Sequence, residues 1–340
     1  MKMDKIKLGV IGAGRIGKIH IENIYSLNEN IEINGVVTNN EETINWLEKY
    51  GITQIYKNAN DLIKNDQINT IIICSPSSFH YDQIKLAASL KKNIFCEKPM
   101  DLDLNNVIKL DQIIKKSKIK FMLGFNRRFD PNFKKVKKNI VEGKIGFPKI
   151  IKITSRDPNP PNLSYLKNSG GIFLDMSIHD FDIARYLIDE EVVSVFSSGY
   201  TFYDNKINEF NDIDTAITTL NFKNGTMAVI DNCRKVSYGY DQRVEVLGSK
   251  GLTGCNNKLH NDSYLFNSNG SHFELPMDFF IDRYSESYVN EIKYFIKCLK
   301  NNMNIELNSR DGILSTAIAF AAKKSLKEKR LVEIREIINL

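Results

Sequence analysis

The stretch Leu8-Gly-Val-Ile-Gly-Ala-Gly-Arg-Ile-Gly-Lys-Ile-His20 (LGVIGAGRIGKIH) runs from an apolar, strand-like segment into a helix-like one. Its glycines, Gly12, Gly14 and Gly17, have the spacing GxGxxG. In that pattern the first glycine permits a tight turn, the second lets a pyrophosphate approach the backbone, and the third allows the helix to pack closely on the strand. The first N–H groups of the helix can then bind phosphate. The stretch predicts a dinucleotide-binding strand–turn–helix unit, with a glycine-rich turn that binds no ligand as the alternative.

Strand-like and helix-like segments alternate over the first 123 residues, which predicts a parallel sheet with helices on both faces. Strands are predicted at 5–11, 33–38, 70–74, 93–96 and 119–123, and helices at 15–26, 41–49, 79–91 and 103–116. Later in the chain, strand-like stretches follow one another at 149–155, 192–200, 213–222, 226–233 and 243–248, before two long helices near 285–300 and 311–328. Asn224-Gly225 is typical of a tight hairpin between two of these strands.

The composition is that of a soluble globular protein. At 340 residues the chain is long enough for two domains with cores of their own. Charged residues make up 26% and hydrophobic residues 42%, and the net charge of +6 is mild. The densest basic group falls on a predicted helix face, where a solvated surface is a better interpretation than a nucleic-acid contact. This group consists of Lys134, Lys135, Lys137 and Lys138.

Hydropathy and cysteine usage narrow the cellular context. No apolar run approaches the roughly 18 residues of a membrane span, and the N-terminus leads directly into a predicted strand, so we expect neither a membrane anchor nor a secretory signal. The cysteines are Cys74, Cys96, Cys233, Cys255 and Cys298. Their odd number and the absence of a CxxC pair argue for reduced thiols, and against a disulfide framework or a thiolate zinc site. We therefore expect a cytoplasmic protein.

A second stretch, Leu174–Leu187 (LDMSIHDFDIARYL), combines an apolar stripe with several titratable side chains. At about 3.6 residues per turn, Asp175, His179, Asp182 and Tyr186 form a second stripe beside the apolar one. One interpretation is a solvated face that carries a local Asp–His pair. The other is a proton-transfer pair that points into a cleft. The stretch alone leaves both open.

The loops that follow the predicted strands suit a dinucleotide. The acidic residue that would bind the adenosine ribose is missing where the second strand ends, and Asn39 stands there instead. An asparagine can bind a ribose hydroxyl without repelling a 2′-phosphate, and no arginine is present to attract one. We therefore favour NAD and leave NADP open. His20, on the helix after the glycines, is interpreted as a packing or capping residue rather than a catalyst.

Three motifs resemble the glucose–fructose oxidoreductase/inositol dehydrogenase/MocA family: GAGRIGKIH at 12–20, CEKPM at 96–100, and GGIFLDMSIHDFDIARYL at 170–187. Further matches at 124–130, 156–161 and 238–243 are similar to its inositol 2-dehydrogenase branch. The resemblance implies an α/β protein with a Rossmann domain, a doubly wound parallel sheet, over residues 1–123. It also implies an α+β domain with a largely antiparallel open sheet over residues 124–340, which binds substrate and forms a homotetramer or homodimer. We leave open that the C-terminal helices pack back on the first domain.

The resemblance also implies functional residues. The catalytic set is Lys98, Asp175 and His179. Together with the loop residues identified above, and with Asn39 in place of the aspartate common in NAD-dependent members, the expected cofactor-binding set is Gly12, Gly14, Arg15, Ile16, Gly17, Asn39, Ser75, Pro76, His80, Glu97, Lys98 and Asn126. The substrate-binding set is Lys98, Arg127, Asp157, Asp175, His179, Tyr238 and Tyr284. No metal is expected, because the histidines are scattered and show no ligand spacing.

These residues predict an alcohol dehydrogenation. A histidine, with an ordinary pKa of about 6.5, suits the proton that leaves the alcohol, so we assign His179 as general base. Asp175 would orient its ring, and Lys98 would stabilise the developing alkoxide. The expected reaction is NAD-dependent oxidation of a cyclic polyol, with myo-inositol giving 2-keto-myo-inositol as the first choice. The nearest alternatives are scyllo-inositol, an aldose, or reduction of a keto-sugar; an NAD-dependent glycosidase and a non-catalytic sugar sensor are more distant.

Overall fold

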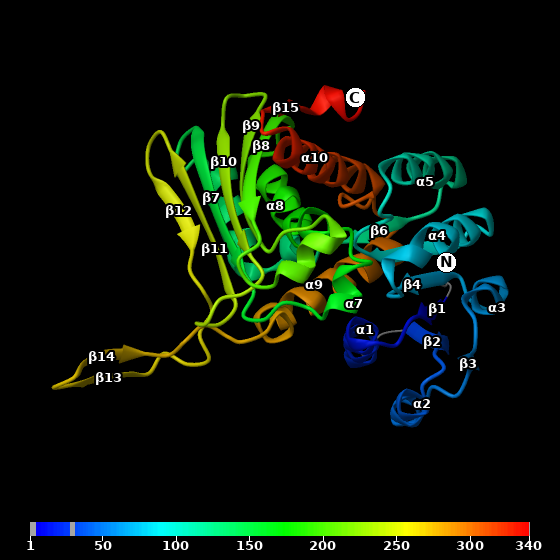
Figure 1. The fold of residues 1–340 in the computed structure, drawn as a ribbon. Coiled ribbons are helices and arrows are strands. Elements are labelled where there is room, and N and C mark those ends of the chain that lie inside the picture. The colour runs from blue at the N-terminus through cyan, green and yellow to red at the C-terminus, as the bar shows by residue number, and fades with distance from the viewer. Residues whose placement is uncertain (1–4, 28–30, 340) are drawn as a thin grey trace. The chain divides into compact units, whose positions relative to one another are not determined.

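A computed structural model of the chain describes residues 5–27 and 31–339 (Figure 1). The chain divides into two compact units, each made of two segments. Unit 1 comprises residues 1–126 and 288–314, and unit 2 comprises residues 127–287 and 315–340. The boundary predicted after residue 123 thus falls close to the division after Asn126, and one C-terminal segment belongs to unit 1. Residues 1–4, 28–30 and 340 of the predicted domains lie outside the described residues.

Unit 1 is built on a parallel sheet of six strands in the order β3-β2-β1-β4-β5-β6. The strands are β1 (Ile6–Ile11), β2 (Ile31–Val37), β3 (Ile55–Tyr56), β4 (Thr70–Ile73), β5 (Asn93–Glu97) and β6 (Phe121–Gly124). The expected doubly wound sheet is confirmed, with β3 as an additional short edge strand. The chain order reverses between β1 and β4, and ligands of open α/β sheets bind at the carboxyl ends of strands beside such a reversal.

Helices cover this sheet. They are α1 (Arg15–Ser26), α2 (Glu41–Glu48), α3 (Ala59–Lys64), α4 (His80–Ser89) and α5 (Leu104–Ser117). Local capping explains several of their starts, because the side chains of Asn40, Asn58 and Asp103 each accept a hydrogen bond from a backbone N–H in the first turn. Two long helices, α9 (Phe280–Lys300) and α10 (Ser309–Glu328), each contribute residues to both units.

Unit 2 is built on a seven-stranded sheet in the order β12-β11-β7-β10-β9-β8-β15. The strands are β7 (Pro148–Arg156), β8 (Val192–Tyr200), β9 (Thr215–Phe222), β10 (Met227–Cys233), β11 (Asp241–Gly248), β12 (Leu252–Cys255) and β15 (Val332–Glu333). Only the β7–β10 pair is parallel among the described pairs of this sheet, which confirms the largely antiparallel prediction. Gly225, at φ 88°, makes the predicted hairpin turn between β9 and β10.

The α-helices that lie wholly within unit 2 are α6 (Pro131–Val141), α7 (Leu163–Leu166) and α8 (Ile178–Ile188). Helix α8 is buried on nearly every side, which is typical of a helix in the centre of a domain. The other face of the sheet exposes apolar side chains, among them Phe196, Ile217 and Val229. A separate hairpin of β13 (Tyr264–Asn267) and β14 (Gly270–Phe273) projects from this unit and is exposed along its whole length (Figure 1).

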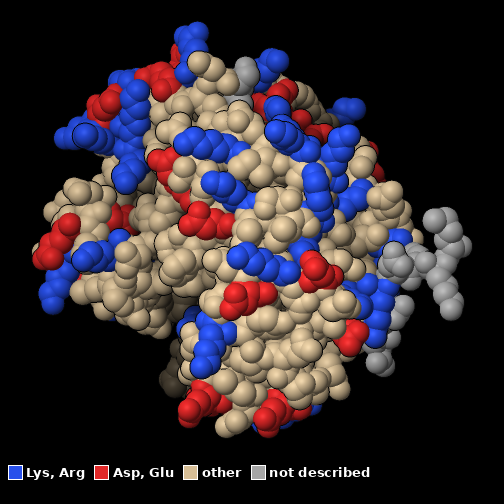
Figure 2. All heavy atoms as spheres, turned by 90° about the vertical axis from the view of Figure 1, so that its right-hand side faces the viewer, with Lys and Arg blue, Asp and Glu red and all other residues tan. Residues whose placement is uncertain are grey.

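The surface is mixed in charge. On the face drawn in Figure 2, basic side chains are interspersed with acidic and uncharged ones. The predicted basic group lies on α6, where Lys134, Lys135 and Lys138 are exposed while Phe133 and Val136 are buried, as on an ordinary solvated helix. Within the described ranges, no helix combines the length and hydropathy needed to cross a membrane.

Candidate active site

The three glycines that follow β1 have the geometry of a dinucleotide loop. Gly12 has φ 89°, and a Cβ there would lie 2.7 Å from the carbonyl oxygen of Cys74. A Cβ at Gly17 would overlap the carbonyl oxygen of Gly12. Gly14, by contrast, has open space beside it, and α1 starts at the next residue, Arg15. The loop therefore presents an uncovered backbone and the N–H groups of a helix start, and this arrangement fits a pyrophosphate.

The loop after β2 carries Asn39, which is exposed. Its side-chain amide donates a long hydrogen bond of 3.4 Å to the backbone oxygen of Lys57. The next residue, Asn40, caps α2 by accepting from the backbone N–H of Thr43 at 2.8 Å. Asn39 is thus held at the end of β2, where an adenosine ribose would lie in this fold, and its polar group stays accessible to solvent.

The loops after β4 and β5 are tied together by His80. One ring nitrogen lies 2.8 Å from the backbone oxygen of Ser75, and the other lies 2.7 Å from that of Pro99. Burial lowers the pKa of His80, against the opposite effect of these two carbonyl groups. Both ring nitrogens are thus engaged with the backbone, so a cofactor contact by His80 stays a prediction. Ser75 donates to Gln83 at 2.7 Å, which fixes the same loop.

The Glu-Lys-Pro motif ends β5. Glu97 lies 2.7 Å from Nε2 of His20, which is buried. Lys98 is half-buried and is joined to Pro99 by a cis peptide bond. A Cβ at Gly124, the last residue of β6, would lie 3.2 Å from the Glu97 carboxylate. Glu97 is therefore held from two sides, and Lys98 follows it at the carboxyl edge of the parallel sheet.

The predicted catalytic residues of unit 2 lie at the start of the central helix. Asp175 belongs to a π-helical turn, Phe173–Ser177, and His179 lies in the first turn of α8. Such turns are rare and occur frequently at functional sites. The sequence pattern predicted one regular helix here, and this detail is wrong because the wider turn displaces Asp175 from the regular spacing. Asp182 is also not on an accessible stripe, since it is fully buried and pairs with Arg128 at 2.6 Å.

Asp175 is fixed by two partners that the sequence analysis missed. Its Oδ2 accepts from Nη1 of Arg234 at 2.9 Å, and its Oδ1 accepts from the hydroxyl of Tyr165 at 2.8 Å. Arg234 is 1% exposed and also lies 3.8 Å from Asp212. It stands immediately after β10, a position with no local motif to mark it. Asp175 is thus a firmly oriented carboxylate at the edge of a buried ionic cluster.

The same cluster includes two predicted substrate residues. Arg127 donates to Oδ1 of the buried Asp180 at 2.5 Å, and Asn232 donates to Oδ2 of that carboxylate at 2.8 Å. Asp157 follows β7, and desolvation raises its pKa to about 7. The charges of Asp175 and Asp180 act in the same direction, whereas those of Arg234 and Arg127 oppose them. Asp157, Arg127 and Asp175 therefore belong to one electrostatic group in unit 2.

The two predicted tyrosines differ in their surroundings. Tyr284 is buried, its ring lies 5.5 Å from the guanidinium carbon of Arg127, and burial raises its pKa to about 12. Its hydroxyl donates to Gln242 at 3.2 Å. Tyr238 instead accepts from Arg156 at 2.7 Å and donates to Asp241 at 2.8 Å. The structure thus brings Tyr284 next to Arg127, while the Tyr238 hydroxyl is already bonded to Arg156 and Asp241.

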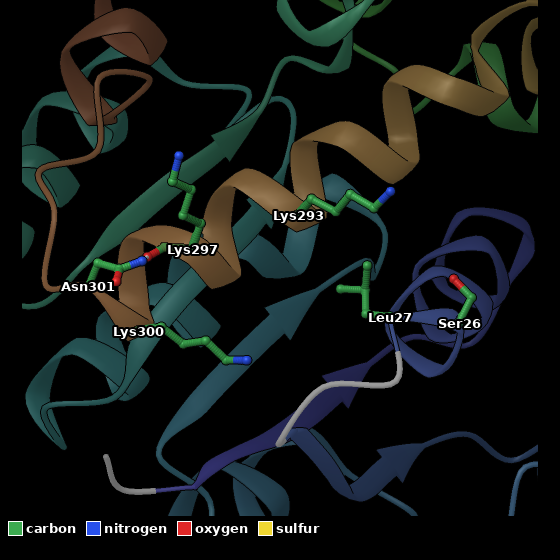
Figure 3. A pocket seen from close by; sticks show the side chains of 6 residues that line it. All are labelled: Ser26, Leu27, Lys293, Lys297, Lys300 and Asn301. Carbon is green, nitrogen blue, oxygen red and sulfur yellow. The ribbon is translucent and has the colours of Figure 1, made fainter. Parts of the chain in front are cut away.

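One hollow in unit 1 lies apart from all of these residues. Its volume is about 470 Å³, and it is lined by Ser26, Leu27, Lys293, Lys297, Lys300 and Asn301 (Figure 3). The lining residues come from the C-terminal end of α1 and from the C-terminal turns of α9. None of them is a predicted site residue. Its three lysines lie on the surface of a helix, where charged side chains are normally exposed to water.

Comparison with known proteins identifies the family. Residues 6–125 match the model of the oxidoreductase family with an NAD-binding Rossmann fold, and residues 133–253 match the GFO/IDH/MocA C-terminal domain. The chain is 42% identical to myo-inositol 2-dehydrogenase of Thermotoga maritima over 98% of this chain and 100% of the relative. It is 39% identical to inositol 2-dehydrogenase of Rhizobium meliloti over 97% of this chain and 99% of the relative.

A solved structure extends the likeness to the fold. The crystal structure of scyllo-inositol dehydrogenase from Lactobacillus casei with bound NAD(H) and scyllo-inositol has a TM-score of 0.90 and 29% identity, and the match covers 98% of this chain and 100% of that one. The chain is therefore a member of the GFO/IDH/MocA oxidoreductase family.

Proposed function

We propose that the protein is an NAD-dependent inositol 2-dehydrogenase that oxidises myo-inositol to 2-keto-myo-inositol. One observation carries the proposal: the 42% identity to a myo-inositol 2-dehydrogenase extends over 98% of the chain, which includes the motifs of Lys98, Asp175 and His179. The geometry of the glycine loop supports the cofactor, because an open Gly14 beside a helix start is what a pyrophosphate requires. The carboxyl-rich, arginine-rich cluster of unit 2 supports a substrate with many hydroxyl groups.

The residues that would hold NAD follow from the loops. Gly12, Gly14 and Gly17, with the backbone of Arg15 and Ile16, would bind the pyrophosphate, and Asn39 would bind the adenosine ribose. Ser75, Pro76, Glu97 and Asn126 would border the rest of the cofactor, with Glu97 at the nicotinamide ribose. Bound NAD supplies the hydride acceptor that no side chain can provide. Asn39 carries no charge that would favour or repel a 2′-phosphate.

In the proposed mechanism, His179 takes the proton of the reacting hydroxyl. Asp175 orients the imidazole and stabilises its charged form, and its own position is set by Arg234 and Tyr165. Lys98 holds the reacting oxygen and stabilises negative charge that develops on it. Arg127, Asp157 and Tyr284 bind the remaining hydroxyls. A site matched to each hydroxyl rejects an analogue that lacks one, because a buried polar group is then left without a partner.

The closest competing substrate is scyllo-inositol, since a relative of high structural similarity carries it bound. The test is to incubate purified protein with a panel of inositol stereoisomers and aldoses and to follow NADH or NADPH formation with each cofactor. We expect the highest kcat/KM with myo-inositol and NAD. A higher value with scyllo-inositol would reassign the substrate. No reduction of either cofactor by any member of the panel would remove the dehydrogenase proposal. In a separate incubation with a glycoside, net hydrolysis without net NADH would indicate a glycosidase.

We further propose that the protein forms a homo-oligomer, a tetramer or a dimer. The support is the outer face of the seven-stranded sheet, where Phe196, Ile217 and Val229 are 40%, 53% and 38% exposed. An isolated two-stranded hairpin such as β13–β14 is at best marginally stable in water, which also favours a partner. Light scattering of the purified protein tests this, and a monomer at micromolar concentration would refute it. The five unpaired cysteines are consistent with the cytoplasm that we propose as its compartment.

A further inference from the structure

An arm projects from unit 2 between β12 and α9, and we define it as residues 258–278. It contains the hairpin of β13 and β14 (Figure 1). Every residue from 260 to 275 is exposed. Over that range the arm carries five large apolar side chains, each of them 55–65% exposed: Tyr264, Leu265, Phe266, Phe273 and Leu275. A contiguous apolar surface of this kind marks an interaction site.

Three aromatic side chains of the arm form one face of the hairpin. Because side chains alternate along a strand, Tyr264 and Phe266 lie on the same side of β13. Phe273 of β14 is the register partner of Tyr264. The ring centroid of Tyr264 lies 4.9 Å from that of Phe266 and 6.4 Å from that of Phe273. The arm therefore presents a preassembled aromatic face, and aromatic residues are enriched at the centres of protein interfaces.

The base of the arm is held by the rest of unit 2. Leu259 and Pro276 form a β-bridge across it. The backbone N–H of Tyr240 donates to the backbone oxygen of Met277 at 2.9 Å. Gly239, at φ 101°, lies against the arm, since a Cβ there would come within 2.5 Å of the backbone oxygen of Pro276. The arm is thus fixed at its base, while its outer part is exposed.

The outer part of the arm needs apolar contacts that its own chain does not supply. A two-stranded hairpin alone is at best marginally stable in water. Both strands of this hairpin are exposed at every residue, so little apolar burial offsets the entropy cost of ordering them. A partner that covers the aromatic face would supply the missing burial.

The charge of the arm suits another copy of this chain better than a lipid surface or a nucleic acid. One positive residue, Lys258, stands against the negative residues Asp262, Glu274 and Asp278, so the arm carries a net charge of −2. Segments that bind anionic membranes or nucleic acids are instead rich in Lys and Arg. Since the whole chain carries +6, the chain without the arm carries +8. The body of a second copy therefore offers the opposite charge.

The apolar area of the arm also matches what a stable pair of copies needs. An aromatic side chain can bury about 150–250 Å². Three such side chains that are nearly two-thirds exposed offer roughly 300–500 Å² on one arm. Covering this area removes a similar area on the partner, and a twofold pair does so twice. The total of roughly 1,200–2,000 Å² is the size of a standard specific interface.

We propose that the arm docks its aromatic face on a second copy of this chain, and that two copies exchange arms about a twofold axis. In such a pair the same surface serves both copies, as in most homo-oligomers. The inference rests on the homo-oligomer proposed above and names the element that holds two copies together. The occupant is a protein surface of basic character, which the acidic residues beside the rings would contact.

The test replaces the two phenylalanines of the aromatic face. The variant Phe266→Ser/Phe273→Ser removes apolar area but should stay folded, because both side chains are exposed. We expect the dissociation constant of the oligomer, measured by analytical ultracentrifugation, to rise about 100-fold or more, in keeping with the loss of two aromatic anchors. Tyr25→Ser is the matched control, since Tyr25 is 58% exposed and its ring lies 5.0 Å from that of Tyr50. The control should stay within about 2-fold of the wild type.

Two further measurements address the arm directly. In a shortened variant, Asn-Gly replaces residues 261–274, because this dipeptide suits a two-residue hairpin turn. It should dissociate as readily as the double serine variant. Hydrogen exchange should show protected amides over residues 264–273 in the wild-type oligomer and fast exchange there in the double serine variant. Circular dichroism verifies that each variant is folded.

The outcomes separate the arm from the oligomer itself. A monomeric wild type at micromolar concentration would refute the homo-oligomer. A wild-type oligomer whose dissociation constant is unchanged in both arm variants would overturn the role of the arm alone. So would binding of the wild type to phosphatidylcholine vesicles that the double serine variant loses while its oligomeric state stays the same. None of these measurements needs turnover, so they decide the inference even if no inositol is oxidised.

Discussion

Replacing Arg234 by methionine removes the partner of Asp175 while keeping the apolar stem of the side chain. Arg234 is 1% exposed and lies 2.9 Å from one Asp175 oxygen and 3.8 Å from Asp212. At an effective dielectric of about 20, charges about 3 Å apart attract by roughly 6 kcal/mol before desolvation is counted. Breaking a buried pair by removing one member costs about 3–5 kcal/mol, because the other charge stays buried without compensation. We expect the Arg234→Met substitution to lower the free energy of unfolding by about 3–5 kcal/mol.

Urea denaturation at neutral pH is the assay, with Arg330→Met as the matched control. Arg330 pairs with Glu336 at 2.7 Å, but its side chain is 45% exposed, so solvent screens the pair and the control should lose far less stability than Arg234→Met. The double variant Arg234→Met/Asp175→Asn should recover part of the loss, since the uncompensated carboxylate is then gone. If Arg234→Met loses no more than the control, the buried cluster does not hold Asp175 in the way described.

The remaining predictions concern the proposed base His179, the raised pKa of Asp157 and the glycine loop. His179→Ala should lower kcat by about 100-fold or more, and near-normal turnover would place the base elsewhere. Burial raises the pKa of Asp157 from the ordinary aspartate value of 3.8 to about 7, so the folded state binds an extra proton and stability should fall as pH rises between these values. Asp157→Asn should flatten that slope in urea melts, and an unchanged slope would contradict it. Gly14→Ala should weaken NAD binding about 10-fold or more without loss of stability, since the space beside Gly14 is open and no protein atom would meet the new Cβ. Gly17→Ala should also lower the thermal midpoint, because its Cβ would overlap the carbonyl oxygen of Gly12.

The features that sequence predicts well are those that a local pattern encodes. Gly12, Gly14 and Gly17 are recognisable because a turn, an open backbone and a close contact each require glycine at a fixed spacing. The alternation of strands and helices predicts the parallel sheet of unit 1. The run of successive strands later in the chain predicts the largely antiparallel sheet of unit 2. Boundaries were close wherever a cap or a hairpin signal, such as Asn40 or Asn224-Gly225, stands in the sequence.

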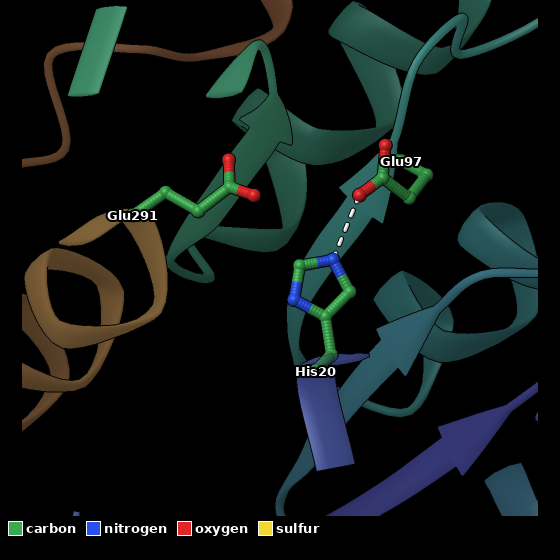
Figure 4. A group of neighbouring side chains, drawn as sticks. All are labelled: His20, Glu97 and Glu291. Carbon is green, nitrogen blue, oxygen red and sulfur yellow. Dashed lines mark hydrogen bonds and ion pairs between the residues drawn. The ribbon is translucent and has the colours of Figure 1, made fainter. Parts of the chain in front are cut away.

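The partners of the site residues cannot be predicted from a local pattern. Arg234 is 59 positions from Asp175, and Asn232 is 52 positions from Asp180, so no local spacing records that they meet. Apolar periodicity also cannot distinguish a π-helical turn from an α-helical one over five residues, and for this reason the shift at Phe173–Ser177 was not predicted. Glu291 looks like an ordinary polar residue on an amphipathic helix until the fold buries it close to a histidine and a second glutamate (Figure 4).

The segment 288–314 makes unit 1 discontinuous, with a consequence for anyone who wishes to work with the nucleotide-binding half alone. A fragment that stops at Asn126 would lose Phe295 from its contact with Phe95, at 5.8 Å between ring centroids, and the bond from Ser309 to Asp111 at 2.7 Å. Its hydrophobic interior would open to water along one side, inviting aggregation during expression. A minimal autonomous module must therefore graft this downstream helix-and-loop segment onto the first 126 residues through an engineered linker.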